Sequence, residues 1–163
     1  MSNSVVVITG GSGGIGQALI KKYLQEECFV ISADLENHTD FDDKNFSFLQ
    51  CNVECENSIN SLFEFVLNKY SKIDYFFSNA GILSLGDENS SNFDWEKNWK
   101  LHLMSHVFVS RKLLPIFKKQ KFGYLLITAS AAGLLTHIDS ITYSVTKHSA
   151  IAFAEWIAIN NRE

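Results

Sequence analysis

Residues that together can move a proton and stabilise a negative charge lie in the last third of the chain. Tyr143 and Lys147 are four positions apart, so on a helix their side chains share one face, one turn apart. A free tyrosine, with a pKa of about 10, is a poor base at neutral pH, but a nearby ammonium group favours the phenolate. Ser130, which ends a predicted strand, could hydrogen-bond a substrate oxygen and stabilise charge there. Taken singly, the first two residues could be a surface pair and the serine a loop residue.

A glycine-rich stretch near the start offers a site for a phosphate group. It follows four β-branched residues (5–8), which are typical of a strand buried on both faces, and precedes apolar residues at helical spacing (17–24). Glycine leaves no Cβ in the way, so a phosphate could approach the N–H groups that open the helix. A glycine run alone is often only a turn, but the flanking strand and helix favour phosphate binding. The predicted binding residues are Gly10, Ser12, Gly13, Gly14, Ile15 and Gly16.

An acidic residue ends the second predicted strand, as expected of a site for a dinucleotide. Asp34 lies about 20 residues after the glycine-rich stretch and could accept hydrogen bonds from the adenosine ribose hydroxyls. It could instead only cap its own loop. Asp34 would repel a 2′-phosphate, and its neighbours Leu35 and Gly13 supply no cation to attract one. These residues predict NAD rather than NADP as the cofactor.

The spacing of these motifs resembles the short-chain dehydrogenase/reductase family. Gly10, Gly14 and Gly16 form a G-x-x-x-G-x-G pattern with Thr9 in front, and the tyrosine–lysine pair follows at the family's separation. The resemblance covers nearly the whole chain. It implies an oxidoreductase acting on an alcohol or carbonyl, in which Tyr143 exchanges a proton with the substrate oxygen while hydride moves to or from nicotinamide. It also implies that Lys147 holds the nicotinamide ribose.

The resemblance implies further cofactor contacts. Asn52 and Val53 stand where family members often carry Asp-Val beside the adenine, so this chain keeps an amide but loses the charge. The segment Asn79-Ala80-Gly81 corresponds to the family's Asn-Asn-Ala-Gly signature, with Ser78 in place of the first asparagine. Thr128, at the end of the fifth predicted strand, is also expected to contact the cofactor.

His102 is a departure from the family pattern. It aligns with an asparagine that opens a helix and holds a water linking the active-site lysine to solvent, so it could relay a proton instead. His102 and His106 are four apart and could suggest a metal, but no third ligand lies at useful spacing. Cys51 and Cys55 have no second pair to complete a zinc site. We therefore expect no metal, with His106 as a packing or surface residue.

The pattern of elements predicts an α/β fold with a doubly wound, Rossmann-like parallel sheet in three layers and strand order 3-2-1-4-5. A long helix is expected from about Asp94 to Lys119, capped by Asp94 or Asn92, with Pro115 kinking or weakening its last turns. The crossover 35–45 is polar and lacks a helical period. The predicted strands are 5–8, 28–33, 46–51, 73–77 and 124–128, and the other predicted helices are 17–24, 58–70 and 143–159.

Length, composition and net charge limit the kinds of partner that the sequence predicts. The 163 residues suit one NAD(P)-binding domain (1–163), and a net charge of −4 gives no indication of nucleic acid or an anionic membrane. No apolar run approaches the roughly 18 residues of a membrane span, and the start lacks the basic region of a signal peptide. We expect a cytoplasmic protein acting on a small alcohol or carbonyl.

The end of the chain raises a second possibility. Family members run to roughly 250 residues, so the chain is expected to lack the usual C-terminal substrate-binding part and to leave its fifth strand as an exposed edge. Residues 151–159 are apolar almost all round, so one side should meet the sheet and the other a partner in a homodimer or homotetramer. The alternative to an active oxidoreductase is a shortened module that only binds nucleotide or self-associates.

Overall fold

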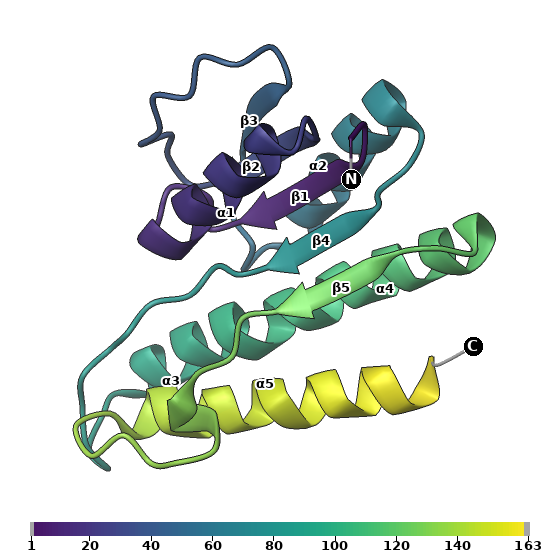
Figure 1. Cartoon of the computed structure of the whole chain (residues 1–163). Coiled ribbons are helices and arrows are strands. Elements are labelled where there is room, and N and C mark those ends of the chain that lie inside the picture. The colour runs from purple at the N-terminus through teal and green to yellow at the C-terminus, as the bar shows by residue number, and fades with distance from the viewer. Residues whose placement is uncertain (1, 162–163) are drawn as a thin grey trace.

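A parallel five-stranded sheet runs through the computed structural model, which describes residues 2–161 (Figure 1). The strand order is β3-β2-β1-β4-β5, so the predicted order is confirmed. All the carboxyl ends therefore lie at one edge, with the crossover reversing direction beside β1. The strands are β1 (Val5–Thr9), β2 (Phe29–Asp34), β3 (Phe46–Gln50), β4 (Tyr75–Ser78) and β5 (Tyr124–Ile127).

Helices cover both faces of this sheet. Along β1, alternate side chains point to opposite faces. Val5 and Val7 pack with α2 (Glu56–Tyr70) and α4 (Ser105–Gln120), and Val6 and Ile8 pack with α1 (Gly14–Gln25). Four consecutive β-branched residues suit a strand with no solvent face, and all four are buried. The helices are α1 (Gly14–Gln25), α2 (Glu56–Tyr70), α3 (Asn92–Trp99), α4 (Ser105–Gln120) and α5 (Ile141–Asn160).

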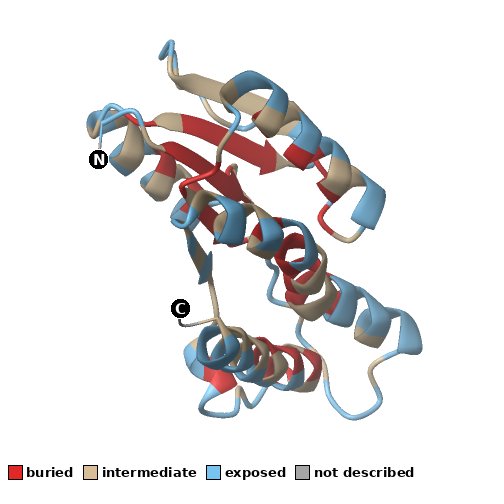
Figure 2. Ribbon diagram, turned by 90° about the vertical axis from the view of Figure 1, so that its right-hand side faces the viewer, coloured by how far each residue is buried: buried red, intermediate tan, exposed pale blue. Residues whose placement is uncertain are grey.

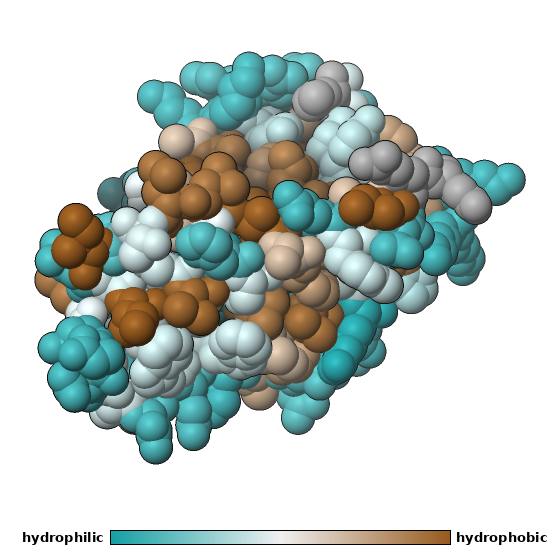
Figure 3. Space-filling view, turned by 90° about the horizontal axis from the view of Figure 1, so that it is seen from below, coloured by the Kyte–Doolittle hydropathy of each residue, from teal (hydrophilic) through white to brown (hydrophobic). Residues whose placement is uncertain are grey.

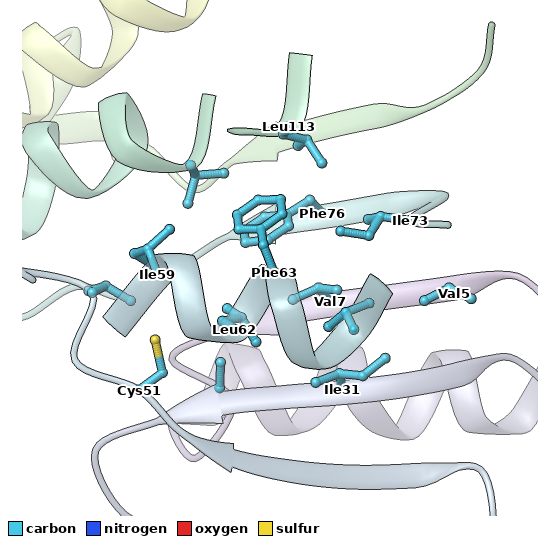
Figure 4. Close-up of a cluster of buried hydrophobic side chains, with 14 of the residues drawn as sticks. Val5, Val7, Ile31, Cys51, Ile59, Leu62, Phe63, Ile73, Phe76 and Leu113 are labelled. Carbon is cyan, nitrogen blue, oxygen red and sulfur yellow. The ribbon is translucent and has the colours of Figure 1, made fainter. Parts of the chain in front are cut away.

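The larger core lies between β1, β2 and β4 on one side and α2 and α4 on the other (Figure 4). Phe63 of α2 stacks on Phe76 of β4 with ring centroids 5.5 Å apart. Leu62 and Leu113 are fully buried beside them. Burial of these side chains holds the central strands rigid, and the ends of those strands carry the candidate site.

The long helix predicted for 94–119 is divided into α3, a π-helical turn (Lys100–Met104) and α4. Neither predicted cap is correct, because Ser91 precedes the helix and its hydroxyl accepts a hydrogen bond from the Asp94 N–H. Pro115 lies within α4, which continues to Gln120. The helix opens into the π-helical turn at His102, the position where the family resemblance implied an opening.

The last helix packs differently from the prediction. We expected one side of residues 151–159 to meet the sheet, but α5 makes its main contacts with α3, the π-helical turn and a 3₁₀ turn (Ala131–Gly133). No residue of 151–159 is fully buried, and the side chains of Trp156 and Ile159 are 61% and 62% exposed. Figure 2 shows this outer half of α5 in tan and blue, whereas the central strands are red.

Two other features bear on the predictions. The crossover between β2 and β3 contains no helix, as expected from its polar sequence. No helix in the described part of the chain is long and apolar enough to span a membrane.

Candidate nucleotide and acid–base site

A cavity of about 450 Å³ lies at the carboxyl edge of the sheet. Its walls bring together most of the predicted site residues, from the glycine-rich turn at one end to Tyr143 at the other. The predicted residues in its lining are Gly10, Gly13, Gly14, Ile15, Gly16, Asp34, Leu35, Asn52, Val53, Asn79, Ala80, Gly81, Thr128, Tyr143 and Lys147. The predicted residues outside the lining are Ser12, His102 and Ser130. Sequence reasoning missed Cys51, Glu54, Ile82, Leu83, Lys97, Leu101 and Ala129, which also line the cavity.

The glycine-rich turn is shaped for close approach. Gly10 has a φ of +67°, and a Cβ there would lie 2.7 Å from the Ala80 Cα atom. A Cβ on Gly16 would collide with the Gly10 carbonyl, so β1 and α1 can only meet this closely with glycine. The α1 N-cap is Gly13, which has no side chain to bond the first N–H groups. These donors and the helix dipole can therefore serve an anion.

Asp34 lines the cavity and also ties the turn together. One carboxylate oxygen accepts the Ser12 N–H at 2.9 Å, and the other accepts the Leu35 N–H at 2.7 Å. Capping of the loop and hydrogen bonding to ribose hydroxyls, the two roles that the sequence left open, are therefore compatible, because each carboxylate oxygen keeps a lone pair for a hydroxyl. The Ser12 hydroxyl donates to the Glu36 carbonyl at 2.6 Å, away from the cavity lining.

Asn79 joins the two ends of the cavity. Its side-chain N–H₂ donates to the Thr9 carbonyl at 3.0 Å, which fixes the start of the glycine-rich turn. Its side-chain oxygen accepts the Thr128 hydroxyl at 2.9 Å. The Thr128 carbonyl in turn accepts the Lys147 ammonium group at 2.9 Å. The order of motifs along the chain gives no hint of this chain of bonds, because it links the ends of β1, β4 and β5 with α5.

Tyr143 and Lys147 stand on the first turns of α5. Ser140 caps this helix and receives the Tyr143 N–H, which sets where the tyrosine emerges. The Lys147 nitrogen lies 5.7 Å from the centre of the Tyr143 ring. Burial lowers the pKa of Lys147 to about 8, because a desolvated ammonium group is disfavoured. The lysine therefore remains mostly cationic at pH 7 and close to the tyrosine.

Ser130 does not reach the cavity wall. Its hydroxyl accepts the Ala132 N–H at 3.1 Å and caps the 3₁₀ turn that follows β5. Its neighbour Ala129 lines the cavity instead. The structure thus brings Tyr143 and Lys147 together with the glycine-rich turn around one cavity, and Ser130 is outside its lining.

His102 occupies the centre of the π-helical turn and is fully buried. Its Nε2 atom accepts the Ile82 N–H at 3.2 Å, so Nδ1 carries the ring proton and faces the Thr146 hydroxyl at 2.9 Å. Burial, together with the charge of Lys147, lowers the pKa of His102 to about 4. Both ring nitrogens are engaged, and the Lys147 ammonium group bonds Thr128 instead. The geometry thus favours holding Ile82 and Thr146 over relaying a proton.

His106 is a packing residue with a specific partner. Its Nδ1 atom lies 2.6 Å from the Ser78 hydroxyl, and the ring is almost completely buried. Burial, then the charges of Lys147 and His102, lower the pKa of His106 to about 3. The serine that replaces a family asparagine therefore pairs with this histidine. Within residues 2–161, no group of three His, Cys, Asp or Glu side chains could hold a metal.

The sheet order, the glycine-rich turn and the tyrosine–lysine pair on one cavity define a dinucleotide-binding α/β protein. The model of the short chain dehydrogenase family matches residues 4–162, and the chain belongs to this family. Its enzymes are oxidoreductases that act on small molecules with nicotinamide cofactors.

Among curated proteins, the chain is 30% identical to the peroxisomal hydratase-dehydrogenase-epimerase of Neurospora crassa, across 94% of this chain and 19% of that protein. It is 28% identical to the asnovolin H dehydrogenase nvfC of Aspergillus novofumigatus, across 94% of this chain and 62% of that protein. The chain thus spans less than two thirds of the length of these relatives.

Solved structures share the fold. A short chain dehydrogenase from Leptospira borgpetersenii with bound NAD+ superposes with a TM-score of 0.92 at 24% identity, over 98% of this chain and 66% of that one. The L-sorbose reductase of Gluconobacter frateurii, complexed with NADPH and L-sorbose, superposes with a TM-score of 0.89 at 21% identity, over 98% of this chain and 65% of that one. Relatives of this fold therefore include both NAD+ and NADPH complexes.

Proposed function

We propose that this chain is an NAD-dependent oxidoreductase domain that transfers hydride between nicotinamide and an alcohol or carbonyl substrate. One observation carries the proposal: a single cavity is lined by the glycine-rich turn, Asp34, Tyr143 and Lys147. A phosphate-binding end and an acid–base end thus face the same space.

The residues present fit a nicotinamide dinucleotide. The uncapped start of α1 suits the pyrophosphate, and Asp34 suits the adenosine ribose hydroxyls. Asn52 and Val53, which line the cavity, suit the adenine, and Lys147 suits the nicotinamide ribose hydroxyls. When bound, the nicotinamide ring would supply the hydride acceptor or donor.

Tyr143 handles the proton in this proposal. Its deprotonated oxygen takes a proton from an alcohol, or its hydroxyl gives one to a carbonyl, and the Lys147 ammonium group lies 5.7 Å from the centre of its ring. Ser130 stabilises charge on the same substrate oxygen by donating its hydroxyl hydrogen, which the bond from the Ala132 N–H leaves free. His102 acts as a positioning residue for this pair, because it bonds Thr146, which lies next to Lys147.

Among the described residues, the Asp34 carboxylate forms no ion pair, which favours NAD over NADP. A 2′-phosphate next to this carboxylate would meet like charge, and Leu35 offers no compensating group. Glu54 adds a second carboxylate to the cavity lining. Lys97, which belongs to α3, also lines the cavity.

Fluorescence titration with NADH and NADPH tests this proposal. We expect NADH to bind at least tenfold more tightly, since tenfold in Kd corresponds to about 1.4 kcal/mol and like charges in contact cost more than that. Asp34→Ala should reduce the ratio of the NADPH and NADH dissociation constants. Asp42→Ala, which removes the same charge from the exposed crossover, should leave this ratio unchanged. Equal or tighter binding of NADPH by the parent chain would refute the NAD assignment. If Lys97 pairs with the 2′-phosphate, Lys97→Gln should weaken the binding of NADPH but not that of NADH.

The alternative is a module that binds nucleotide or associates with itself without turnover. The position of Ser130 outside the cavity lining favours it, as does the exposed outer half of α5. Under this alternative, NADH binds but no NADH forms from NAD+ and a panel of secondary alcohols. We propose a homodimer or homotetramer formed through α4 and α5, and a monomeric mass in light scattering at micromolar concentration would contradict it.

A further inference from the structure

Two loops lie side by side at the carboxyl edge of the sheet, next to the cavity. One is segment 82–91, which follows β4, and the other is segment 129–140, which joins β5 to α5. The Gly86 N–H donates to the Asp139 carbonyl at 2.9 Å, and the Ile141 N–H donates to the Gly86 carbonyl at 3.3 Å. Backbone bonds in both directions make the two loops one connected surface.

This surface is anchored to the helix that carries Tyr143. Ser140, the buried cap of α5, donates its hydroxyl to the Ser84 carbonyl in the first loop. Ser144, also buried, accepts the His137 N–H at 2.9 Å. The rings of His137 and Tyr143 have centroids 6.5 Å apart. The two loops therefore have a fixed position beside the acid–base residues.

Large apolar side chains stand in solvent on both loops. Ile138 is 94% exposed and Leu135 is 70% exposed, although ordering such side chains in water gains nothing for folding. Leu83 also lines the cavity together with Tyr143 and Lys147, so this surface continues into the site. In Figure 3, apolar atoms appear on the left, on the side where segment 129–140 meets α5. We call the following residues the apolar rim: Ile82, Leu83, Leu85, Leu134, Leu135 and Ile138.

The charges on the two loops are of one sign. Neither segment contains a lysine or arginine, and their charged residues are Asp87, Glu88 and Asp139. A substrate with a carboxylate or phosphate would meet like charge on this side of the site. A polyol would lose hydration against leucine and isoleucine side chains without gaining partners for its hydroxyls.

We propose that the apolar rim binds the hydrocarbon part of a neutral ketone or secondary alcohol and discriminates against anionic and polyhydroxylated substrates. This inference rests on the proposed function, because it assigns the substrate class of the same site. It places the substrate carbonyl at Tyr143 and its alkyl part against Leu83 and Leu135.

A homologous series of ketones tests the rim. Methyl ethyl, methyl propyl and methyl butyl ketone are titrated by ligand-detected NMR, beside levulinate and dihydroxyacetone, with and without NADH. Affinity should rise about threefold per added methylene group, and levulinate should bind at least about tenfold more weakly than methyl butyl ketone. Leu83→Ser and Leu135→Ser should flatten the series. Ile159→Ser, an equally exposed apolar position near the far end of α5, should not (Figure 1).

The outcomes separate this inference from the proposed function. Failure of NADH to bind overturns the nucleotide assignment, while the ketone series without NADH still judges the rim, because its loops are already connected. The proposal for the apolar rim is refuted if affinity does not rise along the ketone series. It is also refuted if levulinate or dihydroxyacetone binds as tightly as methyl butyl ketone. A flat series together with self-association that Leu135→Ser abolishes assigns the same surface to a second copy of the chain and also overturns it.

Discussion

Replacing Gly14 with alanine should separate folding of the glycine-rich turn from its ability to admit a phosphate. Gly14 is the first residue of α1 and lines the cavity, and a Cβ there would meet no protein atom within 4 Å. Alanine restricts the unfolded chain more than glycine does, so stability should rise by up to about 0.5–1 kcal/mol. The methyl group would stand where a phosphate approaches the helix N–H groups. Losing one charge-assisted hydrogen bond costs about 1.5–3 kcal/mol, or roughly 10- to 100-fold in Kd for NADH.

Gly10→Ala is the matched control, with the opposite stability effect. The φ of +67° at this position costs an alanine about 1–2 kcal/mol, and its Cβ would lie 2.7 Å from the Ala80 Cα atom and 3.0 Å from the Ala80 nitrogen. Both neighbours are backbone atoms, which cannot rotate away. At roughly 2–4 °C per kcal/mol for a chain of this size, this backbone strain alone should lower the midpoint of thermal unfolding by about 2–8 °C.

Thermal denaturation followed by circular dichroism, and NADH titration followed by fluorescence, measure the two effects on the same samples. The expected pattern is a Gly14→Ala variant that is at least as stable as the parent but binds NADH weakly. If Gly14→Ala instead unfolds as early as Gly10→Ala, or binds NADH as tightly as the parent, the assignment of the open space at Gly14 to a phosphate is wrong.

Three further predictions concern the polar groups around the site. If Lys147 supports Tyr143 as a cation, turnover should decline above about pH 8, where the folded lysine loses its proton, and a flat rate profile to pH 10 would contradict this. Between about pH 8 and about pH 10.4 only the unfolded lysine keeps its proton, so the free energy of unfolding should rise over this range. His102 and His106 are held neutral in the folded state, so the unfolded state binds more protons below about pH 6.5 and the free energy of unfolding should fall towards pH 4. Measured by urea unfolding, this loss of stability should be smaller when both histidines are replaced by asparagine. Thr128→Val removes the hydroxyl bonded to the asparagine amide after β4, which should cost about 1 kcal/mol, whereas Thr136→Val, at an exposed position, should cost almost nothing in the same assay.

Sequence reasoning worked best where the signal is local. The β-branched run 5–8, the glycine spacing that follows it and the helical period of α2 each reflect burial of one element against its neighbours. Strand order followed from the family resemblance and from the motifs at each strand end. For these reasons most of the predicted nucleotide-binding residues do line one cavity.

Side-chain partners could not be predicted in the same way. Ser130 has the right position in the chain, but the orientation of its hydroxyl depends on the N–H of Ala132 in a 3₁₀ turn. Lys97 of α3 and Leu101 of the π-helical turn enter the cavity lining because of how these two segments pack on the rest of the chain. Their spacing along the chain carries no sign of it.

The sequence by itself determined the parallel sheet, the glycine-rich turn and the shared helix face of Tyr143 and Lys147, because each depends on residue types a few positions apart. Only the tertiary structure decided what surrounds His102 and His106. A π-helical turn cannot be read from residue spacing, and the partners Ile82 and Ser78 come from another element. Hydrogen bonds between distant segments depend on the packing of whole elements, and that packing is settled by the hydrophobic core rather than by the polar residues themselves.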